Sequence, residues 1–401
     1  MENLTSWVDV DLDVLSNNIK IIKDFIGETK MLAVVKADAY GHGIVPVALT
    51  AIESGADFIG VSGLDEGILL RKSGIEAPIL VFNTILPEQA EKIIQFDLTA
   101  TVCSLDVVQA LHEAAKRLNI KTRIHIKVDT GFGRFGILPE HTLKFVKIIN
   151  SDFRAVDIEG IYTHFSTASS AAITRNQFEK FQSVTNKIRE SGFNIPLRHA
   201  CNSIATIKYP EMHLDMVRVG NLMYGLCPVG NLNIKKTAKV FSRIIFIKKL
   251  PRGHNVGYGN KYTTKRPTTV AVIPFGYYDG LELLVPQPNG VLDGLKSFLK
   301  QVLLGFGIAR QDRKVRIKGR TFNIIGKIGM QNCMVDVTDL KDDIFIGEQV
   351  ELSTRKVNLC YNLPRVYHRE DEIFVDLRQR TVKFDTGNHY HYERGSEQFI
   401  G

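Results

Sequence analysis

The sequence predicts an α/β protein that combines an N-terminal (β/α)8 TIM-like barrel with a C-terminal mostly-β domain. Between residues 12 and 230, short apolar runs alternate with amphipathic stretches, as expected for parallel strands separated by helices. After residue 235, strand-like runs are punctuated by Gly and Pro, and helical periodicity becomes rare. At 401 residues the chain is long enough for two hydrophobic cores. We therefore predict a barrel domain over residues 12–230 and a β-rich domain over residues 235–401, to which residues 1–11 contribute.

The barrel strands are predicted at eight apolar runs, at residues 31–36, 57–62, 78–83, 98–102, 123–129, 157–163, 197–200 and 215–219. Short runs of continuous apolar residues are typical of strands buried on both faces of a parallel sheet. Between them, residues 106–118 and 175–191 show amphipathic helical periodicity, which predicts helices on the outside of the barrel.

The second domain is predicted to be a sheet of short strands, at residues 240–248, 268–273, 315–318, 323–328, 334–337 and 349–352. Residues 7–12 alternate apolar and acidic side chains, so we expect this N-terminal segment to add a strand to the same domain. Residues 284–312 form a long connection with a predicted helix at 295–303, and the sequence indicates no role for it.

Composition excludes several classes of function. The net charge is +8, but the basic residues are spread along the chain, so we expect no nucleic-acid partner. No apolar run is long enough to cross a bilayer, and the acidic N-terminus lacks the apolar core of a signal peptide, so we expect no membrane association. The five cysteines form no CxxC pair, which argues against a zinc site or a disulfide framework; we expect no metal and a cytoplasmic location.

The most informative segment is the apolar run that ends at Lys36 and is followed by a loop containing Tyr40. An amine at the rim of an apolar wall loses hydration, so its pKa falls and it becomes a better nucleophile. A Schiff base to pyridoxal phosphate requires this property. The alternative interpretation is a lysine that ends a strand and points into water. However, the sequence VVKADAYGHG closely resembles the cofactor-lysine segment of alanine racemases.

A second motif, IHIKVDTGFGRFG, contains Lys127 and Arg134 and also resembles the alanine racemase family. The resemblance implies that Arg134 bonds the phenolic oxygen of the cofactor and approaches the substrate carboxylate. In that family the lysine at the position of Lys127 is often carbamylated. A carbamate is an anion, so it would hold Arg134 in place, whereas an unmodified lysine would repel it. The alternative for Lys127 is an exposed lysine at the end of a strand.

Three further segments complete the resemblance in the barrel domain: EGIYTHFST, HACNS and DMVRVGNLMYG. The family pattern implies that His164 packs on the pyridine ring. Ser203 and the backbone N–H groups of Gly220 and Asn221 would bind the cofactor phosphate, together with the Tyr40 hydroxyl. Arg218 would face the pyridine nitrogen. A guanidinium keeps its protons, so the nitrogen would accept a hydrogen bond and stay unprotonated.

The β-rich domain contains four more matches, in the segments NVGYG, FGYYDG, GMQN and CYNLPR. The resemblance implies that Tyr258 is a second catalytic base, which the partner subunit supplies, so that a homodimer with shared active sites is required. It implies that Tyr277 narrows the pocket entrance, that the Met330 backbone meets the substrate carboxylate, and that Tyr361 lies near the phosphate. Taken singly, the tyrosines could also be ordinary packing residues.

Three positions depart from the family pattern. Gln331 replaces an aspartate, Ser169 replaces another aspartate, and Leu283 stands near the place of an arginine. All three concern the route by which a substrate enters, so they leave substrate preference open.

Over residues 5–369 the resemblance implies a pyridoxal-phosphate-dependent racemase that interconverts L- and D-alanine with Lys36 and Tyr258 as the two bases, and so supplies D-alanine for cell-wall synthesis. The nearest alternative is a racemase of serine or another small amino acid, because an apolar pocket rejects an added hydroxyl only weakly. A decarboxylase of a basic amino acid with this architecture would need an acidic partner for the pyridine nitrogen, and Arg218 argues against it. A non-catalytic cofactor-holding protein would have no need of Tyr258.

Overall fold

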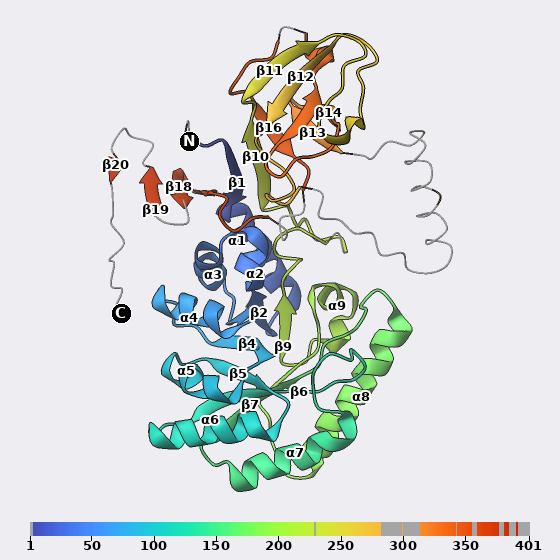
Figure 1. Cartoon of the computed structure of the whole chain (residues 1–401). Coiled ribbons are helices and arrows are strands. Elements are labelled where there is room, and N and C mark those ends of the chain that lie inside the picture. Colours follow the sequence, from blue (N-terminus) through green and yellow to red (C-terminus); the bar gives the residue numbers. More distant parts are fainter. Residues whose placement is uncertain are drawn as a thin grey trace. The chain divides into compact units, whose positions relative to one another are not determined.

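The computed structural model describes residues 3–227, 230–281, 299, 313–341, 343–354, 359–376, 381–384 and 390–391. The chain divides into two compact units (Figure 1). One unit is Asp11–Thr237, and the other comprises Met1–Val10 and the chain from Ala238 onward. Leu283 and, apart from residue 299, the predicted connection at 284–312 with its helix lie outside the described residues.

The first unit is a nearly closed barrel of eight parallel strands, which confirms the predicted fold class. Its strands are β2 (Lys30–Val34), β3 (Phe58–Val61), β4 (Ile79–Thr84), β5 (Thr99–Val102), β6 (Thr122–Lys127), β7 (Val156–Tyr162), β8 (Leu197–His199) and β9 (Met216–Val219). They are ordered β8-β7-β6-β5-β4-β3-β2-β9. Backbone hydrogen bonds from Asp215 to Arg198 (3.1 Å) and from Arg218 to Cys201 (3.0 Å) link the segments at the two ends of this order.

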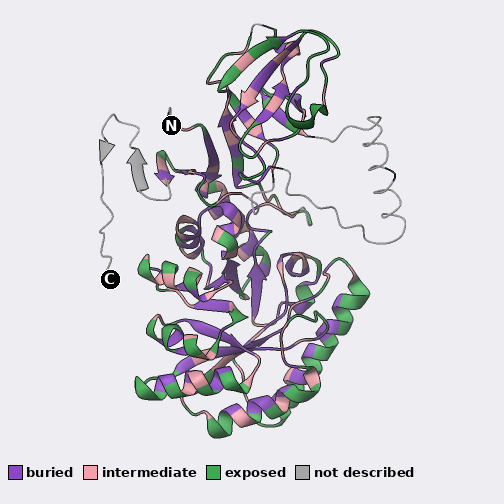
Figure 2. Cartoon of the chain, in the orientation of Figure 1, coloured by how far each residue is buried: buried purple, intermediate pink, exposed green. Residues whose placement is uncertain are grey.

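Helices lie around the outer side of these strands (Figure 1): α1 (Leu12–Ile26), α3 (Ile44–Glu53), α4 (Leu64–Lys72), α5 (Ala90–Gln95), α6 (Leu105–Arg117), α7 (Pro139–Asp152), α8 (Ala171–Glu190) and α9 (Ser203–Lys208). α6 and α8 confirm the two predicted helices. α6 buries Val107, Val108 and Leu111 on one side because these apolar residues recur at helical spacing. Figure 2 shows the resulting contrast between buried strands and helices that expose their outer sides. None of the helices in the described part of the chain is long and apolar enough to cross a membrane.

The segment after β2 differs from the prediction. The strand ends at Val34, and Lys36 begins the short element α2 (Lys36–Gly41). Within α2 the four residues from Ala37 to Tyr40 have φ between 51° and 56°, so the chain makes a left-handed turn. L-residues avoid this conformation at roughly 1–2 kcal/mol each. The carboxylate of Glu66 accepts the Ala37 N–H at 2.7 Å, which helps to hold the turn.

The second unit is a β-rich domain, as predicted. Its strands are β1 (Ser6–Asp11), β10 (Ala238–Arg243), β11 (Phe246–Leu250), β12 (Thr268–Ile273), β13 (Lys314–Ile317), β14 (Arg320–Ile325), β15 (Cys333–Asp336), β16 (Gln349–Leu352), β17 (Arg365–Arg369), β18 (Glu372–Asp376), β19 (Thr381–Phe384) and β20 (Tyr390–His391). β1 pairs antiparallel with β10, so the N-terminal segment adds a strand as expected. The predicted strand at 240–248 is two strands, β10 and β11. The break falls where the backbone changes partner: the Ile244 N–H bonds to the Glu348 carbonyl, whereas the Ile245 N–H bonds to the Val272 carbonyl.

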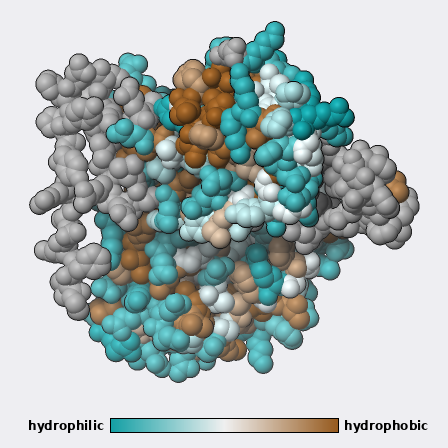
Figure 3. Space-filling view, turned by 45° about the horizontal axis from the view of Figure 1, so that its top comes forward, coloured by the Kyte–Doolittle hydropathy of each residue, from teal (hydrophilic) through white to brown (hydrophobic). Residues whose placement is uncertain are grey.

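Apolar side chains of this unit are both buried and exposed. One core cluster contains Leu250, Val256, Val270 and Ile325. On the surface, two segments that are joined by a hydrogen bond between Ile244 and Gly347 expose large apolar side chains: Ile245, Phe246, Phe345 and Ile346. Figure 3 shows one dense group of hydrophobic residues on the visible surface and smaller hydrophobic patches scattered among hydrophilic residues.

Candidate active site

A cavity of about 300 Å³ opens in the barrel unit, where several strands end and the following loops begin. It is lined by nine of the residues predicted from the sequence: Lys36, Tyr40, Lys127, Arg134, His164, Ser203, Arg218, Gly220 and Asn221. These residues come from five strand ends that are far apart in the sequence. The C-terminal ends of barrel strands are where active sites form in this fold.

Other residues of the cavity were not predicted from the sequence, and Tyr162 is the most prominent. It is buried, and its ring stacks on His199 with the ring centroids 4.7 Å apart. The Lys127 amine and the Arg218 guanidinium lie over the same ring, 4.7 Å and 5.2 Å from its centroid. A signal was available, because Tyr162 lies at the C-terminal end of a predicted barrel strand, next to the motif residue His164, and active-site residues gather at such ends.

Lys36 is placed at the wall of this cavity with a lowered pKa. Burial is the main cause, and the positive charges of Arg134 and Arg218 add to it, while Glu66 acts in the opposite direction. A larger fraction of the amine is therefore neutral near pH 7 than for an ordinary lysine. A neutral amine is both a nucleophile and a base.

Ser203, Gly220 and Tyr40 form one end of the cavity and could bind an anion. The Ser203 hydroxyl oxygen accepts the Gly220 N–H at 2.9 Å and the Leu222 N–H at 3.3 Å, which leaves its proton available to donate. A Cβ on Gly220 would lie 2.7 Å from the Tyr40 hydroxyl oxygen, so a larger residue there would displace that hydroxyl or the backbone. Burial raises the pKa of Tyr40 to about 12, so its hydroxyl stays protonated and can also donate.

Arg218 is buried and held by several partners. It donates to His199 Nδ1 at 2.9 Å, to the Thr163 and Ala200 carbonyls at 2.8 and 2.9 Å, and to His164 Nδ1 at 3.2 Å. Burial lowers its pKa to about 10, so the guanidinium remains charged at neutral pH. Its Nε makes no hydrogen bond within the described part of the chain. A fixed donor thus remains free at a residue that lines the cavity.

Lys127 is buried, and its Nζ has no hydrogen-bond partner among the described residues. Burial, with the charges of Arg218 and Arg134, lowers its pKa well below the ordinary value. An unsatisfied amine in such a place is unfavourable unless it is modified or finds a ligand. Arg134 stacks on the rings of Phe132 and Phe135, at 4.6 and 5.0 Å from their centroids.

The β-rich unit holds the other four predicted residues, and the structure brings their loops together. The Tyr277 N–H bonds to the Gly329 carbonyl at 3.2 Å, next to Met330, and a Cβ on Gly329 would lie 3.9 Å from the Tyr258 ring. The Cys360 N–H bonds to the Asp279 carbonyl at 3.3 Å, which ties in the loop of Tyr361. All four side chains are exposed, Tyr258 at 73%.

Three positions depart from the family pattern, and the structure describes two of them, Ser169 and Gln331. Both side chains are exposed. Ser169 lies in the barrel unit and pairs with Thr167 at 2.8 Å, and Gln331 lies in the β-rich unit beside Met330.

Comparison with known proteins covers both units. Residues 10–228 match the family model of the alanine racemase N-terminal domain, and residues 237–381 match that of the C-terminal domain. The alanine racemase of Halothermothrix orenii is 34% identical over 94% of this chain and 96% of its own length. That of Clostridium novyi is 36% identical over 87% of this chain and 86% of its own length.

Solved structures give the same result. The alanine racemase of Clostridium difficile has a TM-score of 0.83 and 31% identity, and the match covers 93% of this chain and 98% of that one. The Bacillus anthracis alanine racemase with bound L-Ala-P has a TM-score of 0.77 and 27% identity, covering 92% of this chain and 96% of that one. Because both family models and relatives over most of its length agree, this chain belongs to the alanine racemase family.

Proposed function

We propose that this chain is a pyridoxal-phosphate-dependent racemase that interconverts L- and D-alanine with two bases, acting as a homodimer. The observation that carries the proposal is the barrel cavity, where a lysine of lowered pKa, a buried guanidinium and an anion cradle lie together. Relatives named as alanine racemases over most of the chain support alanine as the substrate.

The residues of the cavity fit the proposed cofactor. The Ser203 and Tyr40 hydroxyls and the Asn221 backbone N–H suit a phosphate, and the missing Cβ at Gly220 leaves room for the Tyr40 hydroxyl. The Gly220 N–H itself, expected to be a phosphate donor, bonds to the Ser203 hydroxyl oxygen instead. Arg218 would donate to the pyridine nitrogen, and His164 would pack against the ring. When bound, pyridoxal phosphate draws electrons from the bonds at the amino acid's Cα, which makes the α-proton acidic.

Lys36 and Tyr258 then move protons on opposite faces of the substrate. Lys36 Nζ is the base for one face, because its lowered pKa leaves it partly neutral. Tyr258 of the partner subunit is the base for the other face. Its exposure on its own unit supports this role, because a side chain that packs in its own core could not serve another chain.

Arg134 would bind the substrate carboxylate, assisted by the Met330 backbone N–H. Lys127 is suited to carbamylation: its neutral amine adds to carbon dioxide, an N–C bond forms, and one proton leaves. The resulting carbamate would accept hydrogen bonds from Arg134. Tyr277 and Tyr361 would crowd the space beyond Cβ, which favours alanine over larger substrates.

The cytoplasm suits this function, because all five cysteines are free thiols and the product D-alanine would enter cell-wall synthesis from there.

The test is direct. Purified protein with added pyridoxal phosphate is incubated with L-alanine, L-serine and a basic L-amino acid, and enantiomers and amines are separated by chiral chromatography. Formation of D-alanine at the highest rate supports the proposal. D-serine at a higher rate than D-alanine would replace the substrate assignment, and an amine product would refute a racemase. Borohydride treatment followed by peptide mapping should place the cofactor on Lys36.

A further inference from the structure

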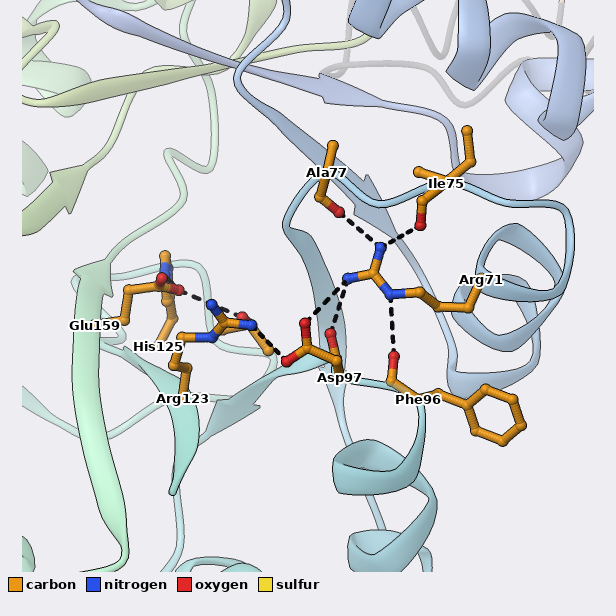
Figure 4. Close-up of polar contacts among 9 residues, drawn as sticks. Arg71, Ile75, Ala77, Phe96, Asp97, Arg123, His125 and Glu159 are labelled. Atoms are coloured by element: carbon orange, nitrogen blue, oxygen red, sulfur yellow. Dashed lines mark hydrogen bonds and ion pairs between the residues drawn. The ribbon is translucent and has the colours of Figure 1, made fainter. Parts of the chain in front are cut away.

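A chain of three hydrogen bonds leads away from Arg218 through the interior of the barrel. Arg218 contacts His199 Nδ1 at 2.9 Å, His199 Nε2 contacts His125 Nδ1 at 2.9 Å, and His125 Nε2 contacts a Glu159 carboxylate oxygen at 3.1 Å. The four residues come from β9, β8, β6 and β7. Figure 4 shows the far end, where His125 and Glu159 point toward one another.

Donor chemistry allows the protons in this hydrogen-bond chain only one arrangement. A guanidinium can only donate, so His199 Nδ1 accepts and its proton lies on Nε2. His125 Nδ1 must then accept from His199, so His125 donates from Nε2 to the Glu159 carboxylate. Both imidazoles are neutral in this arrangement. Burial lowers the pKa of each, for His199 well below its ordinary value, with the charge of Arg218 acting in the same direction.

Neighbouring residues of the barrel interior leave space for the hydrogen-bonded His125 and His199 and pack against them. Gly160 lies against His125, and a Cβ there would stand 2.5–2.7 Å from three atoms of the His125 ring. The pairing of β6 with β7 shifts register at His125. Tyr162 stacks nearly parallel to His199, with an angle of 10° between the rings. His125 and His199 are fully buried, so water does not compete for their hydrogen bonds.

Glu159 ends the hydrogen-bond chain. Among the described residues, it is the only negatively charged group that hydrogen bonds connect to Arg218. Burial raises the pKa of Glu159, but the hydrogen bond from His125, the nearby Arg123 charge and Thr99 hold it below the ordinary value overall, so the carboxylate is ionised. Arg123 itself is paired with Asp97 at 2.5 Å (Figure 4). Glu159 is therefore left to accept from His125, with a weaker contact from Thr99 at 3.3 Å.

We propose that Glu159 is a positioning residue for Arg218, acting through His125 and His199. The carboxylate holds the His125 proton on Nε2, so that His125 Nδ1 accepts from His199. The tautomer in which His199 accepts from Arg218 is thereby supported from both ends, and His199 holds the guanidinium with its free donor at the cavity. This inference rests on the proposed function, in which that donor meets the pyridine nitrogen of the cofactor. A charge near the opposite end of the barrel thus sets the hydrogen bond that the cofactor ring receives.

The first measurement uses the apoprotein, so it does not depend on cofactor or substrate. In protein labelled with ¹⁵N-histidine, each ring nitrogen reports whether it carries a proton, and His125→Asn and His199→Asn assign the signals. We expect both residues to be neutral with the proton on Nε2. In Glu159→Leu, which removes the final acceptor, we expect a mixture of tautomers. A His199 proton on Nδ1 in the wild-type protein, or unchanged signals in Glu159→Leu, would overturn the proposal.

The second measurement follows pyridoxal phosphate labelled with ¹⁵N in its ring. We expect the dissociation constant to rise roughly tenfold in Glu159→Leu, a change of about 1.4 kcal/mol, and the bound pyridine resonance to move. Glu159→Gln keeps an acceptor but loses the charge, so a smaller shift is expected. Glu179→Gln, an exposed change on α8, should match the wild type.

The outcomes are separable. If the tautomers change in Glu159→Leu but affinity and pyridine resonance do not, the positioning role is wrong. If Glu159→Leu does not fold, Glu159→Gln decides, and a pyridine resonance identical to the wild type rejects the role. Wild-type protein that binds no pyridoxal phosphate would refute the proposed function and the role of Glu159 in it, whereas the apoprotein tautomers would still report on the hydrogen-bond chain itself.

Discussion

Tyr40 and Gly220 approach each other so closely that a Cβ on residue 220 would stand 2.7 Å from the Tyr40 hydroxyl oxygen. The Tyr40 ring is held by its packing, so that displacing its hydroxyl has a cost. It packs on Tyr224 with 5.0 Å between ring centroids, and the Tyr224 hydroxyl donates to the Val34 carbonyl at 3.1 Å. The position of the Tyr40 hydroxyl is therefore coupled to the backbone at residue 220.

Gly220→Ala should weaken the binding of pyridoxal phosphate by roughly ten- to a hundredfold, because the new methyl displaces one phosphate donor. Titration of apoprotein followed by absorbance measures the dissociation constant. Gly63→Ala is a matched control, since a Cβ there meets no atom within 4 Å. Equal affinity for Gly220→Ala and the wild type would remove Tyr40 and Gly220 from the phosphate site.

Lys127→Met should stabilise the apoprotein in buffer free of carbon dioxide. The buried amine has no hydrogen-bond partner among the described residues, and such a group costs about 1–3 kcal/mol. Denaturant unfolding near pH 7 measures the gain. Lys144→Met, an exposed change on α7, should have little effect.

The pH dependence of unfolding gives Lys127 a second test. Because burial lowers its folded pKa, the unfolded chain binds more protons between that value and the ordinary 10.5. The free energy of unfolding should therefore rise with pH through this window, and Lys127→Met should flatten the rise. If the free energy of unfolding of Lys127→Met rises with pH as steeply as that of the wild type, Lys127 is not buried as an amine.

Tyr258→Phe should separate the two faces of the reaction. Lys36 is expected to remove the α-proton of D-alanine and Tyr258 that of L-alanine, so the variant should still exchange the α-hydrogen of D-alanine in deuterated water. Exchange with L-alanine should fall much further, by about 10²–10⁴-fold. NMR of each enantiomer measures both rates. Equal losses would leave Tyr258 with a role in shaping the pocket only.

The shared site predicts complementation between inactive variants. Lys36→Ala and Tyr258→Phe chains, mixed so that subunits exchange, should regain activity because one site of each mixed dimer has both bases. Separate tags on the two variants allow the mixed dimers to be isolated and counted. Mixed dimers without activity would mean that both bases come from one chain.

The barrel could be predicted because its strands are continuous apolar runs, and such runs indicate buried strands without knowledge of distant contacts. The turn at residues 37–40 was not, since its residues carry no glycine or asparagine to signal a positive φ. β17 and β18 were missed because charged residues interrupt their apolar pattern. Nine cavity residues followed from motifs near strand ends. The contact between His125 and His199 joins strands β6 and β8, so it exists only once the barrel curves and could not be read from spacing.

The left-handed turn between Lys36 and Gly41 restricts how this segment can vary. At Ala37 and Ala39, glycine should be accepted, because it enters the left-handed region without steric conflict, although it makes the unfolded chain more flexible. Valine, isoleucine and threonine should be rejected there, because branching at Cβ makes a positive φ most unfavourable. In a library covering every substitution, these two positions should thus show a preference opposite to that of right-handed helices, where glycine is among the poorest residues. At the exposed Ala37, the handedness of one short turn would select the amino acid beside the lysine, whereas at the buried Ala39 packing adds to the same selection.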